Sequence, residues 1–371
     1  MPCPAGTDRR RVYAPRPADY DDQPIVLDRS MRPPMTAGFV ATVPWSPLVT
    51  VVDAPVLVRW NMAFASTKTG WRRPVRQAAK TAFRLVHQRL GVPAMGRLRL
   101  GSPGDQRVFR ADMSNTAYSK VLLAERTTGF EPELAALLRQ LAPRLGTVFD
   151  IGANCGFFSA RLLTMPDFTG HIHAFELVPS TCRALVGMRE DCGFSERLTC
   201  HAFGLSDTEA TVGVDVGVHS SLARIADGGT VSARVRRLDS LDLPNPDLIK
   251  IDVEGHETPV LDGARDTLST AQPVVVFESW DRPNDTAAMR APFDRLGDLG
   301  YSFFALRASW TADGQIRLSL DPVTPEERTK IDAQLNILAV PHGRRYLLSE
   351  RFQPWSADPD PSQGSEYGAD R

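Results

Sequence analysis

The sequence predicts an α/β fold with one doubly wound, mostly parallel sheet and helices on both of its faces. Three observations predict it. From Gly129 onward, short apolar runs alternate with helical or loop stretches, an alternation that is typical of parallel sheets. A glycine-rich turn follows the first apolar run, and charged residues interrupt the run that begins at Leu248. Both features suit the carboxyl ends of central strands, where open sheets of this class bind ligands.

The elements of this predicted domain, residues 129–350, follow in order. A helix is expected over residues 131–145, where leucines recur at helical spacing. Strands are expected at residues 147–151, 171–175, 198–203, 248–253, 274–277, 301–306 and 336–340. They would form a seven-stranded sheet whose last strand is antiparallel. Residues 210–216 and 230–236 alternate apolar and polar side chains, which predicts an inserted antiparallel β-hairpin between the third and fourth strands.

The segments that flank this domain have a different composition. Residues 1–58 contain ten prolines and no strand or helix period, so we expect a disordered extension, and likewise a disordered tail over residues 354–371. Residues 59–128 form a basic segment, with twelve Lys and Arg against one acid between positions 59 and 110. Within it, residues 74–91 predict an amphipathic helix. That helix either packs on the domain with a solvated basic face, or contacts a membrane surface or another anionic partner.

Whole-chain composition excludes several classes of protein. The net charge of −1 over 371 residues argues against a protein whose whole surface is built for nucleic acid or anionic lipid. Five cysteines without CxxC spacing fit a reducing compartment better than a disulfide framework or a zinc site. No apolar run is long enough for a transmembrane span, and no apolar stretch of a secretory signal follows the N-terminal arginines. We therefore expect a cytoplasmic protein; the oligomeric state stays open.

The turn after the first strand predicts a cofactor site. It reads D-I-G-A-N-C-G, with Asp150 closing the strand and Gly152, Asn154 and Gly156 in the turn. Glycines allow the backbone to turn sharply and to approach a ligand. A dinucleotide fingerprint would carry glycine where Asn154 stands. A carboxylate at position 150 would repel a diphosphate and would suit the cationic groups of S-adenosylmethionine (SAM).

Two further acids fit a nucleoside. Glu176 closes the second strand about twenty residues after the turn, where an acid accepts hydrogen bonds from ribose hydroxyls. NAD and SAM share that feature, so it does not choose between them. Asp207, in the G-L-S-D turn after the third strand, either contacts adenine or only caps the turn.

The stretch D-L-I-K-I-D-V-E-G-H-E at residues 247–257 places Lys250 and Asp252 on one face of a strand that should be apolar on both. Unpaired buried charge is costly. The two side chains either form an ion pair that orders the sheet or form a polar floor beside the cofactor cleft. Asp252 and Glu278 end neighbouring strands and could coordinate a metal, but the sequence shows no complete ligand set, so no metal is predicted.

These motifs, with A-F-E at residues 174–176, R-L-D-S-L before the charged strand and a final F-E, resemble the FkbM family of methyltransferases over residues 129–341. The resemblance implies a class I SAM methyltransferase fold, SAM as cofactor and usually O-methylation of a hydroxyl on a natural product or on a sugar of a glycan or glycolipid. The SAM motif matches at Asp150, Gly152, Asn154, Gly156 and Glu176, and the post-strand motif at Asp252, Glu254, His256 and Glu257. The sequence departs from the family at Cys155 and in its long N-terminal extension.

We therefore predict an O-methyltransferase acting on a small-molecule or glycan hydroxyl. A hydroxyl needs a base near neutral pH, and His256 has the ordinary pKa closest to that range. Asp252 is the rival base, although pairing with Lys250 would lower its pKa. Two alternatives remain, a nicotinamide-dependent oxidoreductase and a catalytically idle SAM-fold binding module.

Overall fold

The computed structural model describes residues 38–64, 72–101, 106–125, 129–216, 224–226, 228–280 and 285–355. All of them lie in the compact unit formed by residues 36–371. The predicted disorder of residues 1–37 and 356–371 lies outside the described residues. No helix in the described ranges is long and apolar enough to cross a bilayer.

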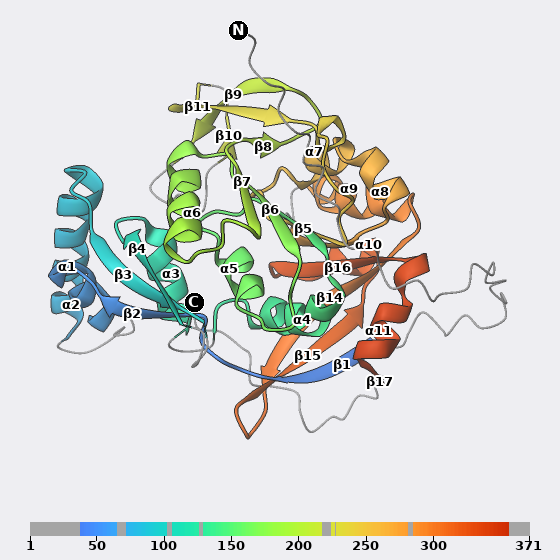
Figure 1. Cartoon of the computed structure of the whole chain (residues 1–371), viewed down its shortest axis with the longest axis horizontal. Coiled ribbons are helices and arrows are strands. Elements are labelled where there is room, and N and C mark those ends of the chain that lie inside the picture. The colour runs from blue at the N-terminus through green and yellow to red at the C-terminus, as the bar shows by residue number, and fades with distance from the viewer. Residues whose placement is uncertain are drawn as a thin grey trace, which may run out of the picture. The chain divides into compact units, whose positions relative to one another are not determined.

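One large mixed sheet organises this unit (Figure 1). In spatial order, its ten described strands are β17 (Gln353–Trp355), β1 (Gly38–Pro44), β15 (Gln315–Pro322), β14 (Tyr301–Trp310), β16 (Leu335–Pro341), β13 (Val274–Ser279), β12 (Leu248–Ile251), β5 (Thr147–Ile151), β6 (His171–Phe175) and β7 (Leu198–His201). Strands β7, β6, β5, β12 and β13 are parallel, and β16 is antiparallel to both β13 and β14. The predicted doubly wound sheet with an antiparallel last strand is confirmed.

The sheet has more strands than the seven predicted. Strand β15 continues it beyond β14, and β1 and β17 follow, so residues 38–44 and 353–355 belong to the folded unit. The prediction of disorder is wrong for residues 38–44 and for residues 354 and 355. Phe39 pairs with Leu320 and Val43 with Ile316, and Ala41 and Val43 are buried. This apolar surface has its partner far along the chain, and local sequence patterns do not reveal such partners.

Two smaller sheets lie beside the large one. The sheet of β10 (Arg224–Ile225), β9 (Ala210–Asp215), β11 (Val231–Arg236) and β8 (Gly204–Leu205) contains the predicted hairpin, because β9 and β11 are antiparallel. The second sheet, β2 (Val49–Asp53), β3 (Met95–Leu100) and β4 (Arg107–Asp112), falls where the sequence predicted only an extension and a basic segment.

Helices cover both faces of the large sheet, because successive side chains of a strand point to opposite faces. Val148 and Val276 pack with helices α4 (Pro132–Leu141), α5 (Phe157–Leu163) and α6 (Pro179–Asp191). Phe149 and Val275 pack with α7 (Glu257–Asp262), α8 (Arg265–Thr270) and α9 (Thr286–Gly297) on the other side. The remaining helical elements are α1 (Val56–Phe64), α2 (Arg72–Phe83), the π-helical turn η1 (Arg84–Arg89), α3 (Thr116–Glu125), η2 (Ala142–Arg144), η4 (Leu238–Ser240), α10 (Pro325–Arg328), η5 (His342–Arg344) and α11 (Tyr346–Arg351).

Candidate functional site

The chain reverses its direction of strand addition between β5 and β12, since β6 and β7 extend the sheet one way and β13 the other. Loops diverge at such a point and leave a crevice at the carboxyl ends of the strands. A cavity of about 610 Å³ lies there. Its walls include Gly152 and Asn154 after β5, Glu176 after β6, and Asp252 and His256 after β12.

The turn after β5 is shaped by close packing. Gly152 has φ +78°, and a Cβ at this position would lie 1.8 Å from the carbonyl oxygen of Asp252. Only glycine fits, which brings the turn against the loop after β12. A Cβ on Gly156, at φ +82°, would lie 2.4 Å from Leu185 Cδ1. Gly156 is not among the cavity residues, so its role is the packing of α5 on α6.

Strained backbone marks the cavity. Four non-glycine residues in the described ranges have positive φ, and three of them, Glu131 (46°), Asn154 (50°) and Glu254 (54°), line the cavity. Such conformations cost about 1–3 kcal/mol each and concentrate at functional sites, where the surrounding structure holds them. The fourth, Gln272, lies elsewhere.

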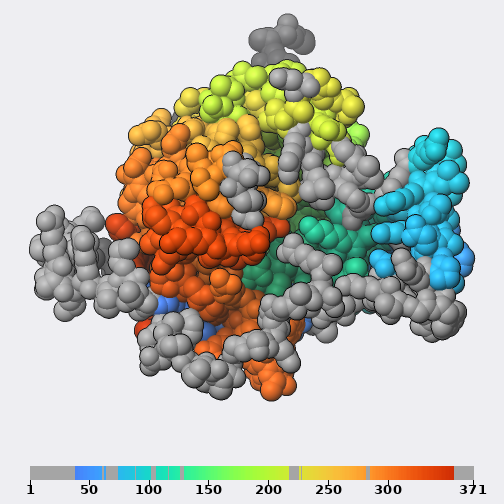
Figure 2. Space-filling view, turned by 180° about the vertical axis from the view of Figure 1, so that it is seen from behind, coloured from blue at the N-terminus to red at the C-terminus, as the bar shows by residue number. Residues whose placement is uncertain are grey.

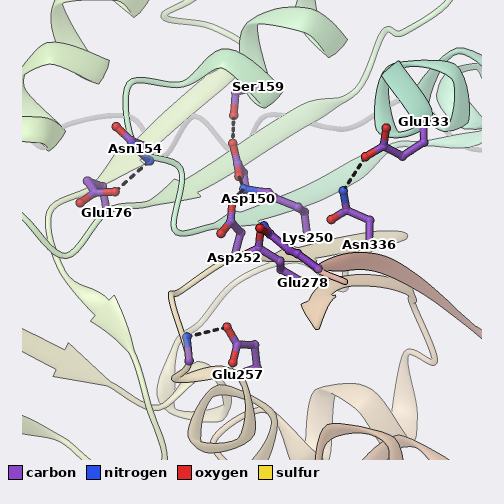
Figure 3. A network of polar contacts seen from close by, with 12 residues as sticks. Glu133, Asp150, Asn154, Ser159, Glu176, Lys250, Asp252, Glu257, Glu278 and Asn336 are labelled. Atoms are coloured by element: carbon purple, nitrogen blue, oxygen red, sulfur yellow. Dashed lines mark hydrogen bonds and ion pairs between the residues drawn. The ribbon is translucent and has the colours of Figure 1, made fainter. Parts of the chain in front are cut away.

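Glu176 presents a fixed carboxylate to the cavity. Its Oε2 accepts a hydrogen bond from Asn154 N (2.8 Å), and its Oε1 accepts one from Val178 N (2.9 Å), as Figure 3 shows for the Asn154 contact. Burial raises its pKa to about 7, while the two backbone N–H groups act in the opposite direction. Each oxygen keeps a lone pair for a donor in the cavity. Beside it, Asn154 Oδ1 is buried without a hydrogen-bond partner among the described residues.

Asp150 lies behind the cavity, not in its wall. It is fully buried, and its Oδ2 accepts a hydrogen bond from Ser159 Oγ at 2.6 Å. Parallel pairing sets Lys250 beside it, with 3.7 Å between Lys250 Nζ and Asp150 Oδ1. In the cavity wall, Lys250 Nζ also contacts Asp252 Oδ2 at 2.9 Å (Figure 3). Lys250 and Asp252 therefore form an ion pair and also line the cavity, so the two alternatives that the sequence left open are compatible.

These charges hold Lys250 protonated. Burial alone would lower its pKa, but Asp252, Asp150 and Glu131 outweigh burial and raise it above the ordinary lysine value. A lysine in this state orients carboxylates and donates hydrogen bonds, and it cannot accept a proton.

One end of the cavity is acidic. Carboxylate oxygens of Asp252, Glu254 and Glu278 lie within 4.8 Å of one another. Oxygens this close together could coordinate one cation. Burial, followed by the nearby carboxylates, raises the pKa of Glu278 to about 9. Burial raises that of Glu131 to about 7, with Lys250 opposing.

Sequence reasoning did not assign a role to Glu131, Trp280 or Gln334, which line the same cavity. Glu131 was the first residue of a predicted helix, and the residue before a proline is normally extended. Its left-handed conformation, just before Pro132, carries no local sequence signal. Residue spacing alone therefore could not have found it.

His256 belongs to a chain of three polar side chains. Its Nε2 lies 2.9 Å from Ser206 Oγ, which donates a hydrogen bond to Asp207 Oδ1 at 3.0 Å. A hydroxyl has one proton, so Ser206 accepts from Nε2–H, and the lone pair of His256 then resides on Nδ1. Burial lowers the pKa of His256, opposed by Asp207, so the imidazole is neutral near pH 7. Asp207 is not among the cavity residues, so it contacts His256 through Ser206.

The residues present fit SAM better than a dinucleotide. Five acids, Glu131, Glu176, Asp252, Glu254 and Glu278, and two lysines, Lys120 and Lys250, line the cavity. A diphosphate would meet this excess of carboxylates, whereas the sulfonium and ammonium groups of SAM would be attracted. Glu176 and the unpartnered Oδ1 of Asn154 are acceptors suited to ribose hydroxyls or an ammonium group.

Comparisons with known proteins agree with this reading of the motifs. A family model described as the methyltransferase FkbM domain matches residues 150–303. No curated protein is similar to the chain at a significant level.

Several solved structures match parts of the chain. Methyltransferase FkbM from Methylobacillus flagellatus KT is 21% identical, with 66% of this chain and 59% of that chain covered and a TM-score of 0.36. Precorrin-6y C5,15-methyltransferase from Geobacter metallireducens GS-15 is 19% identical, with coverages of 56% and 87% and a TM-score of 0.32. O-Methyltransferase TomG from Streptomyces achromogenes is 14% identical, with coverages of 72% and 100% and a TM-score of 0.33. This chain thus spans about three-fifths of the FkbM structure.

The family match begins at Asp150 and includes the turn after β5, Glu176 and the strand with Lys250 and Asp252. Its position coincides with the strands that surround the cavity. Residues 150–303 are therefore similar to the FkbM methyltransferase domain, and they carry the parallel centre of the doubly wound sheet.

Proposed function

We propose that this protein binds SAM and methylates a hydroxyl group of a sugar, glycan or natural-product acceptor. The observation that carries the proposal is the cavity at the switch point, where Glu176 offers an anchored carboxylate beside the tight turn at Gly152. Glu176 would accept hydrogen bonds from ribose hydroxyls, and Asn154 would contact the amino-acid part of the cofactor. Asp150 would act indirectly, by fixing Lys250 and Ser159.

The acidic end of the cavity is the proposed acceptor site. Glu131, Asp252, Glu278 and Gln334 supply hydrogen-bond acceptors and donors for a hydroxyl-rich molecule, and Trp280 supplies a flat apolar surface. SAM, when bound, supplies an activated methyl group for in-line transfer to the acceptor oxygen. The protein has to align the acceptor, exclude water and accept the hydroxyl proton.

His256 Nδ1 is the proposed proton acceptor. The hydrogen-bond pattern through Ser206 leaves its lone pair on Nδ1, and the lowered pKa keeps the ring neutral near pH 7. Asp252 remains the rival base. Its Oδ2 is engaged by Lys250 Nζ at 2.9 Å, so we place it, with Lys250, in the orientation of the acceptor.

Titration calorimetry with SAM and with NADH tests the cofactor. Binding of SAM and no heat from NADH is expected, and the reverse would indicate an oxidoreductase. Transfer of label from methyl-labelled SAM to a panel of sugars and hydroxylated natural products then tests the reaction. Label found on nitrogen or carbon atoms of the acceptors would contradict O-methylation. SAM binding without transfer under single-turnover conditions to any of the panel would favour an idle binding module.

The expected cytoplasmic location stays a prediction.

A further inference from the structure

Exposed apolar side chains concentrate in one part of the protein that lies outside the matched family domain. Of the twelve large apolar residues that are exposed in the described ranges, ten lie between Val51 and Leu123. The other two are Trp310 and Tyr346. Soluble proteins expose single apolar residues everywhere, so it is the clustering that needs an explanation.

Strand register brings five of these residues to one end of the sheet β2–β3–β4. Asp53, at the end of β2, pairs with Arg97 of β3, and β3 begins at Met95. The chain leaves β2 toward Val56, the first residue of α1, and enters β3 from Leu90 and Val92. Val56 (76% exposed), Trp60 (46%), Leu90 (67%), Val92 (45%) and Met95 (54%) therefore lie around this end. We call these five residues the N-terminal apolar patch.

The opposite face of the same sheet is buried against the rest of the unit. Leu98 and Phe109 belong to the main hydrophobic core. Along the edge strand β4, Arg110 forms an ion pair with Asp191 of α6 at 3.0 Å, and Arg107 donates to Cys192 O. The sheet is thus attached by its buried face and along its edge strand β4. Helices α1 and α2 lie at the edge of the described part, away from the C-terminal strands, in Figures 1 and 2.

Cations are interleaved with the apolar residues. On α1, Val56, Arg59, Trp60 and Ala63 are exposed at positions i, i+3, i+4 and i+7, which form one face of a helix. Lys80, Arg84 and Arg89 are exposed along α2 and η1. Tryptophan, aliphatic side chains and cations on one surface are the combination that enters the headgroup region of a bilayer.

We infer that the N-terminal apolar patch docks on the surface of a bilayer that contains anionic lipid. A second copy of the same basic surface would be repelled by like charge. Residues 1–37 carry six arginines against five aspartates, so they have no net negative charge to complement it. Nucleic acid would attract the cations, but it offers phosphates to Val56, Leu90 and Val92, which are better accommodated among acyl chains.

Co-sedimentation of the full chain with vesicles tests the inference. Vesicles of phosphatidylcholine alone are compared with vesicles that also contain phosphatidylglycerol, at low and high salt. The chain should bind the anionic vesicles more tightly, and salt should weaken that binding. Absence of binding, equal binding to both lipids, or retention on duplex DNA without vesicle binding would overturn the inference.

Paired variants separate the apolar from the electrostatic contribution. Leu90→Asn with Val92→Asn should weaken binding about tenfold or more at either salt concentration, because apolar side chains leave the bilayer. Lys80→Glu with Arg84→Glu should weaken it mainly at low salt. The matched controls are Tyr346→Asn, and Arg139→Glu with Arg317→Glu, exposed residues outside the patch. An equal loss of vesicle binding in the control variants would contradict the assignment of the N-terminal apolar patch as the docking surface.

A conservative variant keeps the test decisive if the others unfold. Brominated lipid should quench the tryptophan fluorescence of the wild-type chain. Of the six tryptophans in the chain, Trp60 is the one on α1. Trp60→Phe should therefore reduce this quenching while it still sediments with vesicles, and Trp310→Phe should leave the quenching unchanged. Unchanged quenching in Trp60→Phe would show that α1 does not enter the bilayer. SAM affinity, measured on every variant, should stay at the wild-type value, since the patch lies outside the cavity.

Discussion

The Ser206 hydroxyl lies 2.9 Å from Nε2 of His256. Because Ser206 donates its proton to Asp207, it accepts the Nε2 proton and directs the histidine lone pair to Nδ1. A motif in the turn after the third predicted strand thus orients a residue that follows the central strand. The contact assigns Asp207 a positioning role that its sequence position did not reveal.

The first prediction concerns this contact. His256→Ala should lower turnover about 10²–10⁴-fold, the usual effect of removing a general base, with SAM affinity near wild type. In the wild type the rate should rise with pH through a value below the ordinary histidine pKa, because burial lowers the pKa of His256 and only the neutral ring accepts a proton. Ser206→Ala should reduce turnover less than His256→Ala does, and its rate should still rise with pH over the same range. Near-normal turnover in His256→Ala, with inactive Asp252→Asn, would assign the base to Asp252.

The second prediction separates a cofactor contact from its support. Glu176→Gln should weaken SAM binding by about 1–3 kcal/mol, because a charge-assisted hydrogen bond becomes neutral. Asp150→Asn should mainly lower the melting temperature, since Asp150 is fully buried behind the cavity and contacts Lys250 and Ser159. Calorimetry and thermal melts on both variants provide the measurement. A loss of SAM affinity in Asp150→Asn as large as in Glu176→Gln, at unchanged melting temperature, would place Asp150 in direct contact with the cofactor.

The third prediction concerns pH. Burial raises the folded-state pKa of Glu131 and Glu176 to about 7 and that of Glu278 to about 9. Between its unfolded and folded pKa values, each group binds more protons in the folded state. Its stabilising contribution is therefore complete below the unfolded pKa and is lost as pH rises through the folded pKa. Burial lowers the pKa of His173 and His201 to about 4, so these two groups oppose the carboxyl groups below the ordinary histidine pKa. Above that range the carboxyl groups act alone, and the melting temperature of the cofactor-free protein should fall between about pH 7 and pH 9.

Single variants resolve this slope. Glu278→Gln should flatten its upper part, and Glu131→Gln its lower part, because each removes one titrating carboxyl group. Glu196→Gln, at an exposed position away from the cavity, is the control and should leave the slope unchanged. A melting temperature that rises over this range in the wild type would contradict the prediction. It would show that the carboxyl groups at the acidic end of the cavity ionise without lowering the stability of the folded protein.

The fourth prediction concerns Arg328, whose side chain is fully buried. Its guanidinium donates to Ser279 Oγ (2.9 Å) and Ser279 O (2.7 Å) at the end of β13, and to Ile331 O (2.8 Å) and Ala333 O (2.9 Å). These hydrogen bonds hold residues 331–333 against β13, the strand that carries Glu278. Residue 333 directly precedes Gln334, which lines the cavity.

Arg328→Lys cannot reproduce this planar set of donors, so it should destabilise the protein by about 2–4 kcal/mol. It should also raise KM for the acceptor more than it changes SAM affinity. Arg317→Lys on the exposed side of β15 is the matched control. A wild-type melting temperature in Arg328→Lys would show that a single ammonium group satisfies these carbonyls.

The sequence alone determined the centre of the fold. Strands β5 and β6 begin and end at the predicted residues, because parallel strands buried on both faces are short, continuous apolar runs bounded by turns. The turn at Gly152 and the acid at Glu176 were likewise readable, since each needs a specific residue type at a fixed distance from a strand end. Both features are local, and local patterns suffice for them.

Only the tertiary structure decided which side chains meet. Strand β1 is stabilised by pairing with β15, far away in the chain, so its own proline-rich surroundings were misleading. Parallel pairing of β5 with β12 brought Asp150 to Lys250 and withdrew it from the cavity, while Glu131 entered the cavity through a left-handed backbone. Burial and the approach of charges from separate strands set the pKa values at the acidic end. These are properties of three-dimensional distance, and residue spacing along the chain does not encode them.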